Sequence, residues 1–213
     1  FKKETASKKQ LAEEAFYVEA ECAKQPTGKQ DPFLGAFGGL TCLEIDRSGK
    51  VTVSPLKLGK NIQRELASSL LVFFTGIQRE SFDILSEQVS STRAGNAATL
   101  ESLHETKKIG YRIRDALTDG NLDQFGHLLD QHWQNKKKRS TNMSNTDIDR
   151  WYQMGRNAGA LGGKILGAGG GGFLMFYCPT EYRRKLRQLM ANEGLREMRF
   201  CIDNEGATIL LNI

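Results

Sequence analysis

The chain has 213 residues, of which 39% are hydrophobic, and its formal net charge is +5. This length suits one or two domains, and the hydrophobic fraction allows a core. Because the basic excess is small and spread along the chain, it permits an anionic ligand, and we expect no nucleic-acid partner. No apolar run approaches the roughly 20 residues of a membrane span, so we also expect no membrane partner.

The first predicted element is a helix over about residues 7–24. Ser7 and Gln10 have the spacing of a capping box, and apolar residues then recur at helical spacing until Pro26 interrupts the pattern. Residues 28–39 are rich in glycine and mixed in character, so they predict a loop.

Strands and helices follow in a mixed order. Residues 40–45 and 51–56 predict a hairpin around Asp46–Gly49, and the apolar run 70–74 predicts a buried strand. Two final strands are expected over 198–202 and 207–211. Further helices are predicted over 81–117 with a break near 93–96, and over 120–134, 147–159 and 181–192. Helices beside an antiparallel sheet indicate an α+β fold.

Four cysteines, Cys22, Cys42, Cys178 and Cys201, lie far apart and include no C-x-x-C pair. Their spacing is not that of a metal site, and they are too few for a disulfide framework. They therefore indicate thiols in a reducing compartment, and we expect a cytoplasmic protein.

The run Leu166–Phe176 contains five glycines between two apolar, strand-like pieces. A turn this rich in glycine can direct several backbone N–H groups at one point and bind an anion. The run also satisfies G-x-G-x-x-G, but the apolar residues Phe173–Cys178 that follow it predict a strand. A dinucleotide fold needs a helix there, so we expect strand, turn, strand. The alternative is a hairpin whose glycines only permit close packing.

Two motifs together resemble a known family. Residues 162–173, G-G-K-I-L-G-A-G-G-G-G-F, look like the third motif of the GHMP small-molecule kinases. Residues 28–31, G-K-Q-D, followed by A-F-G-G at 36–39, resemble the catalytic-aspartate segment of that family. The residues of these two motifs are most similar to those of the sugar-kinase branch that acts on heptose 7-phosphate. The resemblance spans nearly all of the chain.

The resemblance implies an α+β, GHMP-kinase-like fold in two domains. Residues 1–60 would complete a ribosomal-S5-like N-terminal domain, and residues 61–213 would form a ferredoxin-like α/β C-terminal domain. The ATP phosphate loop of the family has no counterpart in the sequence. We therefore expect the C-terminal two-thirds of a kinase, inactive by itself, whose phosphate loop lies in a missing N-terminal segment or on a separate chain.

The implied activity is ATP-dependent phosphorylation of an anomeric hydroxyl on a heptose 7-phosphate or related manno-configured sugar, with ATP and Mg²⁺ as cofactors. Asp31 would be the general base or orient the hydroxyl, and its alternative role is to cap a loop. Glu19 would be the Mg²⁺ ligand, with Glu21 as its rival. Substrate contacts would come from Lys29, Gln30, Gly38, Gly39 and Arg79. Nucleotide contacts would come from Gly167, Ala168, Gly169, Gly170, Gly171 and Gly172.

Other readings remain open at this point. The chain could be a non-catalytic module that binds a sugar or a partner through a GHMP-like fold, and a homodimer is compatible with either reading. The basic run Lys136–Arg139 predicts a solvated surface, with contact to an anion as the alternative. Trp133 and Trp151 lie at helical spacing and predict core positions, and His132 is expected to be structural.

Overall fold

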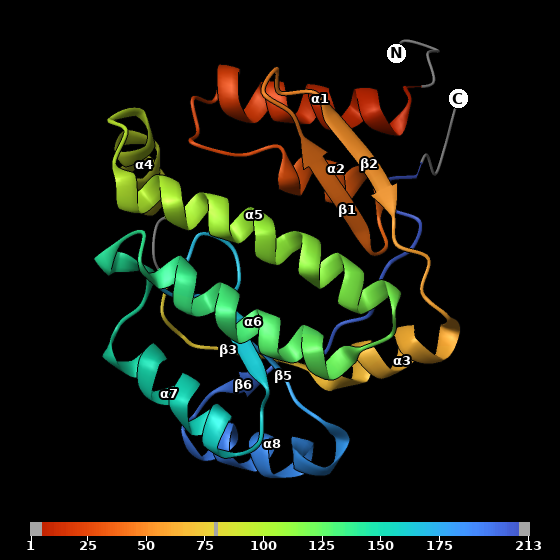
Figure 1. Ribbon diagram of the computed structural model, residues 1–213, viewed down its shortest axis with the longest axis vertical. Coiled ribbons are helices and arrows are strands. Elements are labelled where there is room, and N and C mark those ends of the chain that lie inside the picture. The colour runs from red at the N-terminus through yellow and green to blue at the C-terminus, as the bar shows by residue number, and fades with distance from the viewer. Residues whose placement is uncertain (1–5, 79–80, 209–213) are drawn as a thin grey trace. The chain divides into compact units, whose positions relative to one another are not determined.

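The computed structural model describes residues 6–78 and 81–208, except for the side chains of Ser81 and Thr141 (Figure 1). By its internal contacts the chain divides into two compact units. The first unit runs to Lys57 and resumes at Cys201, and the second is Leu58–Phe200. The predicted domain boundary between residues 60 and 61 stays a prediction about family domains.

The first unit contains two helices and a hairpin. Its elements are α1 (Lys8–Tyr17), a π-helical continuation (Val18–Cys22), α2 (Gln30–Phe37), β1 (Thr41–Ile45) and β2 (Val51–Pro55). Ser7 accepts a hydrogen bond from the Gln10 amide at 3.1 Å, so the predicted N-cap is confirmed. The hairpin is antiparallel and pairs Ile45 with Val51, as its sequence pattern predicts.

The loop predicted over residues 28–39 is wrong, because most of this segment is the helix α2. Pro32 lies in the first turn of α2, where a missing N–H costs nothing. Phe33, Ala36 and Phe37 then face one side, and the first two are fully or almost fully buried against Ala12 of α1. Burial of this apolar side outweighs the low helix propensity of the glycines around it.

In its described residues the second unit combines a four-stranded antiparallel sheet with six α-helices. The sheet order is β4-β5-β3-β6, and each neighbouring pair is antiparallel. The strands are β3 (Leu70–Phe74), β4 (Gly162–Ile165), β5 (Phe173–Tyr177) and β6 (Arg196–Glu197). The helices are α3 (Lys60–Ser69), α4 (Ser81–Arg93), α5 (Ala97–Thr118), α6 (Leu122–Lys137), α7 (Thr146–Asn157) and α8 (Arg183–Asn192), with 3-10 turns at Thr141–Met143 and Thr180–Tyr182.

Asparagine side chains begin three of these helices. Asn96, Asn121 and Asn145 each accept a hydrogen bond at 3.0 Å from an amide in the first turn of α5, α6 and α7. Such caps satisfy amides that would otherwise lack a partner. Glycines with positive φ follow the C-terminal ends of α4, α5, α7 and α8, at Gly95, Gly120, Gly159 and Gly194. These local signals explain why the predicted helices are confirmed close to their predicted bounds.

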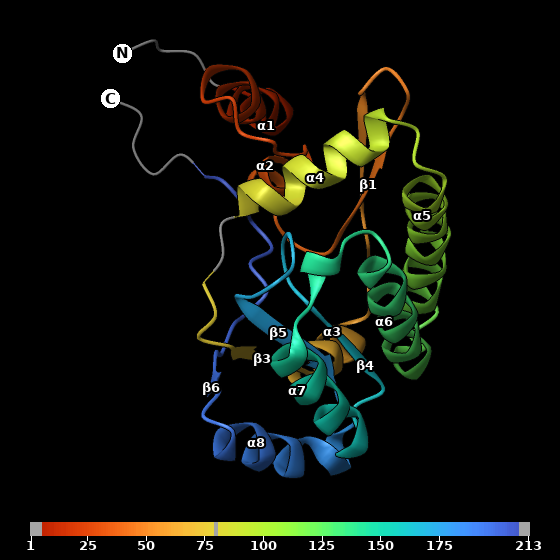
Figure 2. The same cartoon turned by 90° about the vertical axis from the view of Figure 1, so that its left-hand side faces the viewer.

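The core of the second unit lies between the sheet and helices α6, α7 and α8, which surround it in Figures 1 and 2. Trp133 of α6 is fully buried and Trp151 of α7 is 8% exposed, so both predicted core positions are confirmed. Close approach of α6 to β4 depends on Gly162, because a Cβ there would lie 2.7 Å from the amide nitrogen of Asp130. The mixed helix and sheet class predicted from the sequence is confirmed.

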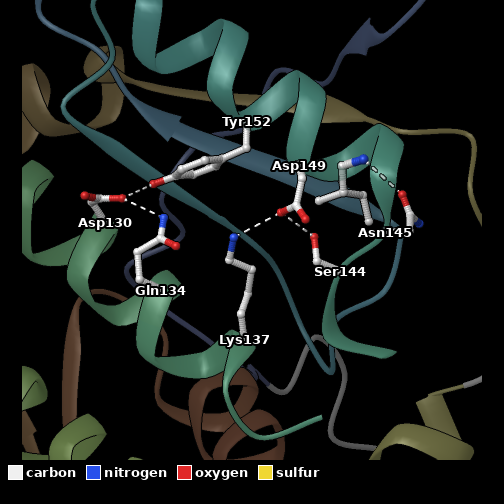
Figure 3. Close-up of polar contacts among 8 residues, drawn as sticks. Asp130, Gln134, Lys137, Ser144, Asn145, Asp149 and Tyr152 are labelled. Atoms are coloured by element: carbon white, nitrogen blue, oxygen red, sulfur yellow. Dashed lines mark hydrogen bonds and ion pairs between the residues drawn. The ribbon is translucent and has the colours of Figure 1, made fainter. Parts of the chain in front are cut away.

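Polar side chains also join α6 to α7 (Figure 3). The Tyr152 hydroxyl donates to Asp130 at 2.6 Å, and burial raises the pKa of this tyrosine. Lys137 pairs with Asp149 at 3.0 Å, and the same carboxylate accepts from the hydroxyl of Ser144. These contacts hold the C-terminal half of α6 in place, next to the glycine-rich turn.

The two closing strands predicted over 198–202 and 207–211 do not form in residues 198–208, and residues 209–211 lie outside the described part. Met198 still donates to the carbonyl of Val72 at 2.8 Å, after which the chain leaves the sheet. Ala207 instead donates to the carbonyl of Gly35 at 3.0 Å within the first unit. Short apolar runs predict burial but do not fix which backbone they will pair with.

Across residues 6–78 and 81–208, no helix has both the length and the apolar character needed to cross a bilayer.

Candidate functional site

Asp31 is the second residue of α2, so it lies in the first turn of a helix and not on the predicted loop. Unpaired N–H groups and the helix dipole favour a carboxylate at this position. The side chain is exposed, and within the described residues it makes no hydrogen bond or ion pair. The fold therefore leaves this carboxylate free to contact a ligand.

Lys29 and Gln30, two of the predicted substrate contacts, immediately precede Asp31. The Lys29 ammonium lies 2.8 Å from Glu13 and 2.8 Å from the carbonyl of Gly49, and it stands over the ring of Phe16. Lys29 therefore joins α1 to the hairpin turn, which is a structural role. Gln30 is exposed at the start of α2.

Gly38 and Gly39, also predicted as substrate contacts, end α2 with φ values of +70° and +66°. The Gly39 amide donates to the carbonyl of Asp203 at 2.6 Å. A Cβ on Gly38 would collide with the backbone of Gly206, which returns to this point from the end of the chain. Here the two glycines serve a close approach of backbone to backbone.

Glu19, the predicted Mg²⁺ ligand, lies in the π-helical continuation of α1 and is exposed. Its carboxylate accepts a hydrogen bond from the Thr27 hydroxyl at 3.2 Å. Glu21, the rival, is instead 3.5 Å from Lys24. No cluster of three or more His, Cys, Asp or Glu suited to a metal occurs among the described residues. Glu19 could therefore hold Mg²⁺ only together with ligands from elsewhere, such as nucleotide phosphates.

The glycine-rich turn joins β4 to β5, so the predicted strand, turn, strand is confirmed and no helix begins within it. Gly167, Gly169, Gly170 and Gly172 all have positive φ, between +66° and +118°. L-residues with a side chain rarely adopt such a path, which explains the composition of the run.

Backbone hydrogen bonds fix the turn against two other loops. The Gly170 amide donates to the carbonyl of Met143, and the Gly172 amide donates to that of Ile77, each at 2.9 Å. Thr75 donates to the carbonyl of Gly172 through both its amide and its hydroxyl, again at 2.9 Å. The turn is thus held in one conformation by contacts within the second unit.

A pocket of about 260 Å³ opens beside the turn. It is lined by Phe74, Ile77, Gln78, Leu166, Ala168, Gly169, Gly171 and Gly172. In the described chain the amides of Ala168, Gly169 and Gly171 donate no backbone hydrogen bond, whereas those of Gly170 and Gly172 do. Glycine amides without a protein partner can serve an anion.

The basic run at the end of α6 is only in part the solvated surface predicted from the sequence, because Lys138 is exposed but Lys136 is buried. Lys136 is 7% exposed, and its ammonium donates to the carbonyl of Gly167 at 2.6 Å. Arg139 is partly buried and donates to the Ser102 hydroxyl at 3.0 Å. Helical spacing from Leu129 and Trp133 places Lys136 on the buried face, and this signal was available in the sequence.

The predicted site residues are divided between the two units. Glu19, Lys29, Gln30, Asp31, Gly38 and Gly39 belong to the first unit, whereas residues 167–172 belong to the second. Their convergence on one cavity stays a prediction. Arg79 lies outside the described residues.

Residues 113–194, within the second unit, match the family model described as GHMP kinases C terminal. The second unit therefore contains a C-terminal domain of the GHMP kinase family, as the glycine-rich motif indicated.

Known proteins resemble the chain over most of its length. A D-glycero-alpha-D-manno-heptose 7-phosphate kinase of Campylobacter jejuni is 31% identical over 87% of this chain and 54% of its own length. An L-fucokinase/L-fucose-1-P guanylyltransferase of Bacteroides fragilis is 31% identical over 84% of this chain and 20% of its own length. The chain thus spans about half of the first relative and a fifth of the second.

A crystal structure shows the same fold. The D-glycero-D-manno-heptose 1-phosphate kinase of Bacteroides thetaiotaomicron matches with a TM-score of 0.71 and 25% identity, over 95% of this chain and 55% of that one.

Proposed function

We propose that the chain is part of an ATP-dependent sugar kinase that phosphorylates an anomeric hydroxyl of a heptose 7-phosphate or a related manno-configured sugar. The observation that carries this proposal is the glycine-rich turn between β4 and β5, whose sequence resembles the third motif of the GHMP kinases. It is held by hydrogen bonds at Gly170 and Gly172, while the amides of Ala168, Gly169 and Gly171 have no backbone partner among the described residues. The names of the relatives support a sugar acceptor.

Phosphoryl transfer depends on positioning and on stabilising the charge of the transferred group. In the proposed reaction, Asp31 accepts the proton of the sugar hydroxyl or orients that hydroxyl, and the glycine amides contact phosphate oxygens. Asp31 suits its role because its carboxylate is exposed and engages no other described residue.

Mg²⁺ would neutralise phosphate charge when bound with ATP. Glu19 is the described carboxylate that we assign to it, because its one contact is a weak hydroxyl hydrogen bond that a metal could replace. Lys29 would support substrate binding through its neighbour Asp31. Its ion pair with Glu13 fixes the start of α2, the helix that carries Asp31.

An assay of ADP release tests the proposal. We expect no turnover from the 213-residue chain alone, and ATP-dependent turnover once a GHMP phosphate-loop segment is supplied in cis or as a second chain. Acceptors should include a manno-configured heptose 7-phosphate and simple hexoses, so that the preferred sugar is identified. Binding of a sugar without turnover under every condition would instead favour the non-catalytic module.

A further inference from the structure

Four basic side chains gather where the end of α6 meets β4 and the glycine-rich turn. Gly162 of β4 faces α6, because its missing Cβ would lie 2.7 Å from the Asp130 amide nitrogen. Lys164 is two residues further along the strand and therefore faces the same way. His132 and Lys136 lie four residues apart on α6, on one side of the helix. Lys164, Lys136 and Arg139 all lie near enough to act electrostatically on His132.

Within the described residues, none of the three cations in this group has a carboxylate partner. Lys136 donates to the carbonyl of Gly167, and Arg139 donates to the hydroxyls of Ser102 and Thr106. For Lys164 no hydrogen bond or ion pair occurs within the described residues. None of the ion pairs formed by residues 6–78 and 81–208 involves any of the three.

The other two residues of the basic run Lys136–Arg139 have different surroundings. Lys137 pairs with Asp149 of α7 at 3.0 Å, as Figure 3 shows, and Lys138 is exposed to solvent. Burial without a carboxylate partner among the described residues therefore distinguishes Lys136 and Arg139 from Lys137 and Lys138. Surface cations need no counterion, but buried ones are costly without one.

Burial and the mutual repulsion of these cations shift the pKa values of the group. Burial, together with Lys164 and Arg139, lowers the pKa of Lys136 to about 7. Burial also lowers the pKa of Lys164 and that of Arg139. Burial and the surrounding cations lower the pKa of His132 to about 3, so the imidazole is neutral, and its buried Nδ1 has no hydrogen-bond partner among the described residues. An anion placed among these groups would reverse each of these trends.

We propose that Lys136, Lys164 and Arg139 form a binding site for a phosphate monoester dianion. Two ammonium groups and a guanidinium carry enough positive charge to neutralise a compact dianion, and arginine suits phosphate through its fork of N–H donors. The hydroxyls of Ser102 and Thr106 already orient the guanidinium. Through Gly167 the site connects to the glycine-rich turn, so its occupancy would bear on the conformation of that turn.

The phosphate group can come from a sugar phosphate or from a nucleotide, and assigning it to either rests on the proposed function. The existence of the site does not rest on the proposed function, because inorganic phosphate would bind to it whether or not the chain supports phosphoryl transfer. Both sources present the same tetrahedral dianion.

The test measures phosphate binding by calorimetry at constant ionic strength, with the pKa of Lys136 followed by NMR of its side chain. We expect inorganic phosphate to bind and to raise the Lys136 pKa above about 7. Lys164→Met should weaken binding about tenfold or more, the loss of one charge-assisted contact. Lys138→Met, an exposed lysine next to the site, should leave binding unchanged.

The inference would be overturned if chloride raised the Lys136 pKa as much as phosphate does. It would also be overturned if the Lys164→Met and Lys138→Met variants bound phosphate equally well. If Lys164→Met does not fold, the wild-type Lys136 pKa decides, since phosphate that leaves it unchanged also overturns the inference. Hexose 6-phosphate and ATP, added separately, identify the source of the group. Phosphate binding without kinase activity would refute only the proposed function, and kinase activity with an unresponsive Lys136 would refute only this site.

Discussion

The ammonium of Lys136 donates to the carbonyl of Gly167 at 2.6 Å, across 31 residues of sequence. This bond joins the last turn of α6 to the first glycine of the turn between β4 and β5. A charge-assisted hydrogen bond from a buried ammonium is stronger than a neutral hydrogen bond, so it restrains the turn at its N-terminal end. The Gly170 and Gly172 amides restrain the rest.

The pH dependence of stability should reflect Lys136. Its pKa is about 7 in the folded chain, against an ordinary value of 10.5. Between these values the unfolded chain binds a proton that the folded chain does not, so the free energy of unfolding should rise with pH. We choose pH 7 to 9, because above about 9 the raised pKa of Cys178 contributes in the opposite direction.

Denaturant unfolding at a series of pH values measures this slope. Lys136→Met should reduce it, whereas Lys138→Met should leave it as in the wild type. A wild-type free energy that does not change from pH 7 to 9 would contradict the buried, uncompensated charge.

The glycine-rich turn should not tolerate a side chain at Gly169. Its φ is +118°, and an added Cβ would lie 2.9 Å from the sulfur of Met143. We expect Gly169→Ala to lower the free energy of unfolding by about 1–3 kcal/mol. Gly110→Ala is the matched control, because that glycine lies within α5 with open space around it. This substitution should raise the free energy of unfolding by roughly 0.5–1 kcal/mol. Equal effects of the two substitutions would show that the turn is not constrained as described.

Asp31→Asn should abolish most of the proposed activity. The change keeps the shape of the side chain but removes its ability to accept a proton, and a general base contributes roughly 10²–10⁴-fold. Steady-state kinetics of the active protein should show a fall in kcat of that size. Asp119→Asn, at an exposed aspartate after α5, is the control and should be neutral. Unchanged turnover in Asp31→Asn would remove Asp31 from the mechanism.

The two glutamates of the π-helical segment offer a direct comparison for Mg²⁺. Glu19→Gln should raise the Mg²⁺ concentration that gives half-maximal activity, because a neutral amide is a poorer ligand for a hard cation. Glu21→Gln should leave that concentration unchanged, as this carboxylate lies beside Lys24. The opposite pattern would identify Glu21 as the ligand.

Local signals explain what the sequence predicted well. Asn121 and Asn145 begin their helices with side-chain caps, and glycines with positive φ follow the ends of other helices. Single residues therefore determine these helix boundaries. The apolar run Phe173–Tyr177 forms a strand because it pairs with β3 and is buried on one face. The asparagine caps and the terminal glycines need no knowledge of distant contacts.

Two of the wrong predictions concern segments in which glycine or charge content points one way and helical spacing another. Phe33, Ala36 and Phe37 have the spacing of a helix face, yet the glycines around them suggested a loop. Lys136 continues the buried stripe of Trp133, yet its charged neighbours suggested a solvated surface. In both cases packing against another element decides the outcome. How Asp31 and the glycine-rich turn relate in space is not a local property and stays a prediction.

The most direct test of the central claim follows the phosphate itself by ³¹P NMR. The active protein, with ATP, Mg²⁺ and a manno-configured heptose 7-phosphate, should lose the γ-phosphate signal of ATP. A new phosphate ester signal should appear at the same rate, coupled to the anomeric proton of the sugar. An ATP spectrum that stays unchanged with every sugar offered, or one that yields only inorganic phosphate, would contradict the assignment of this chain to a sugar kinase.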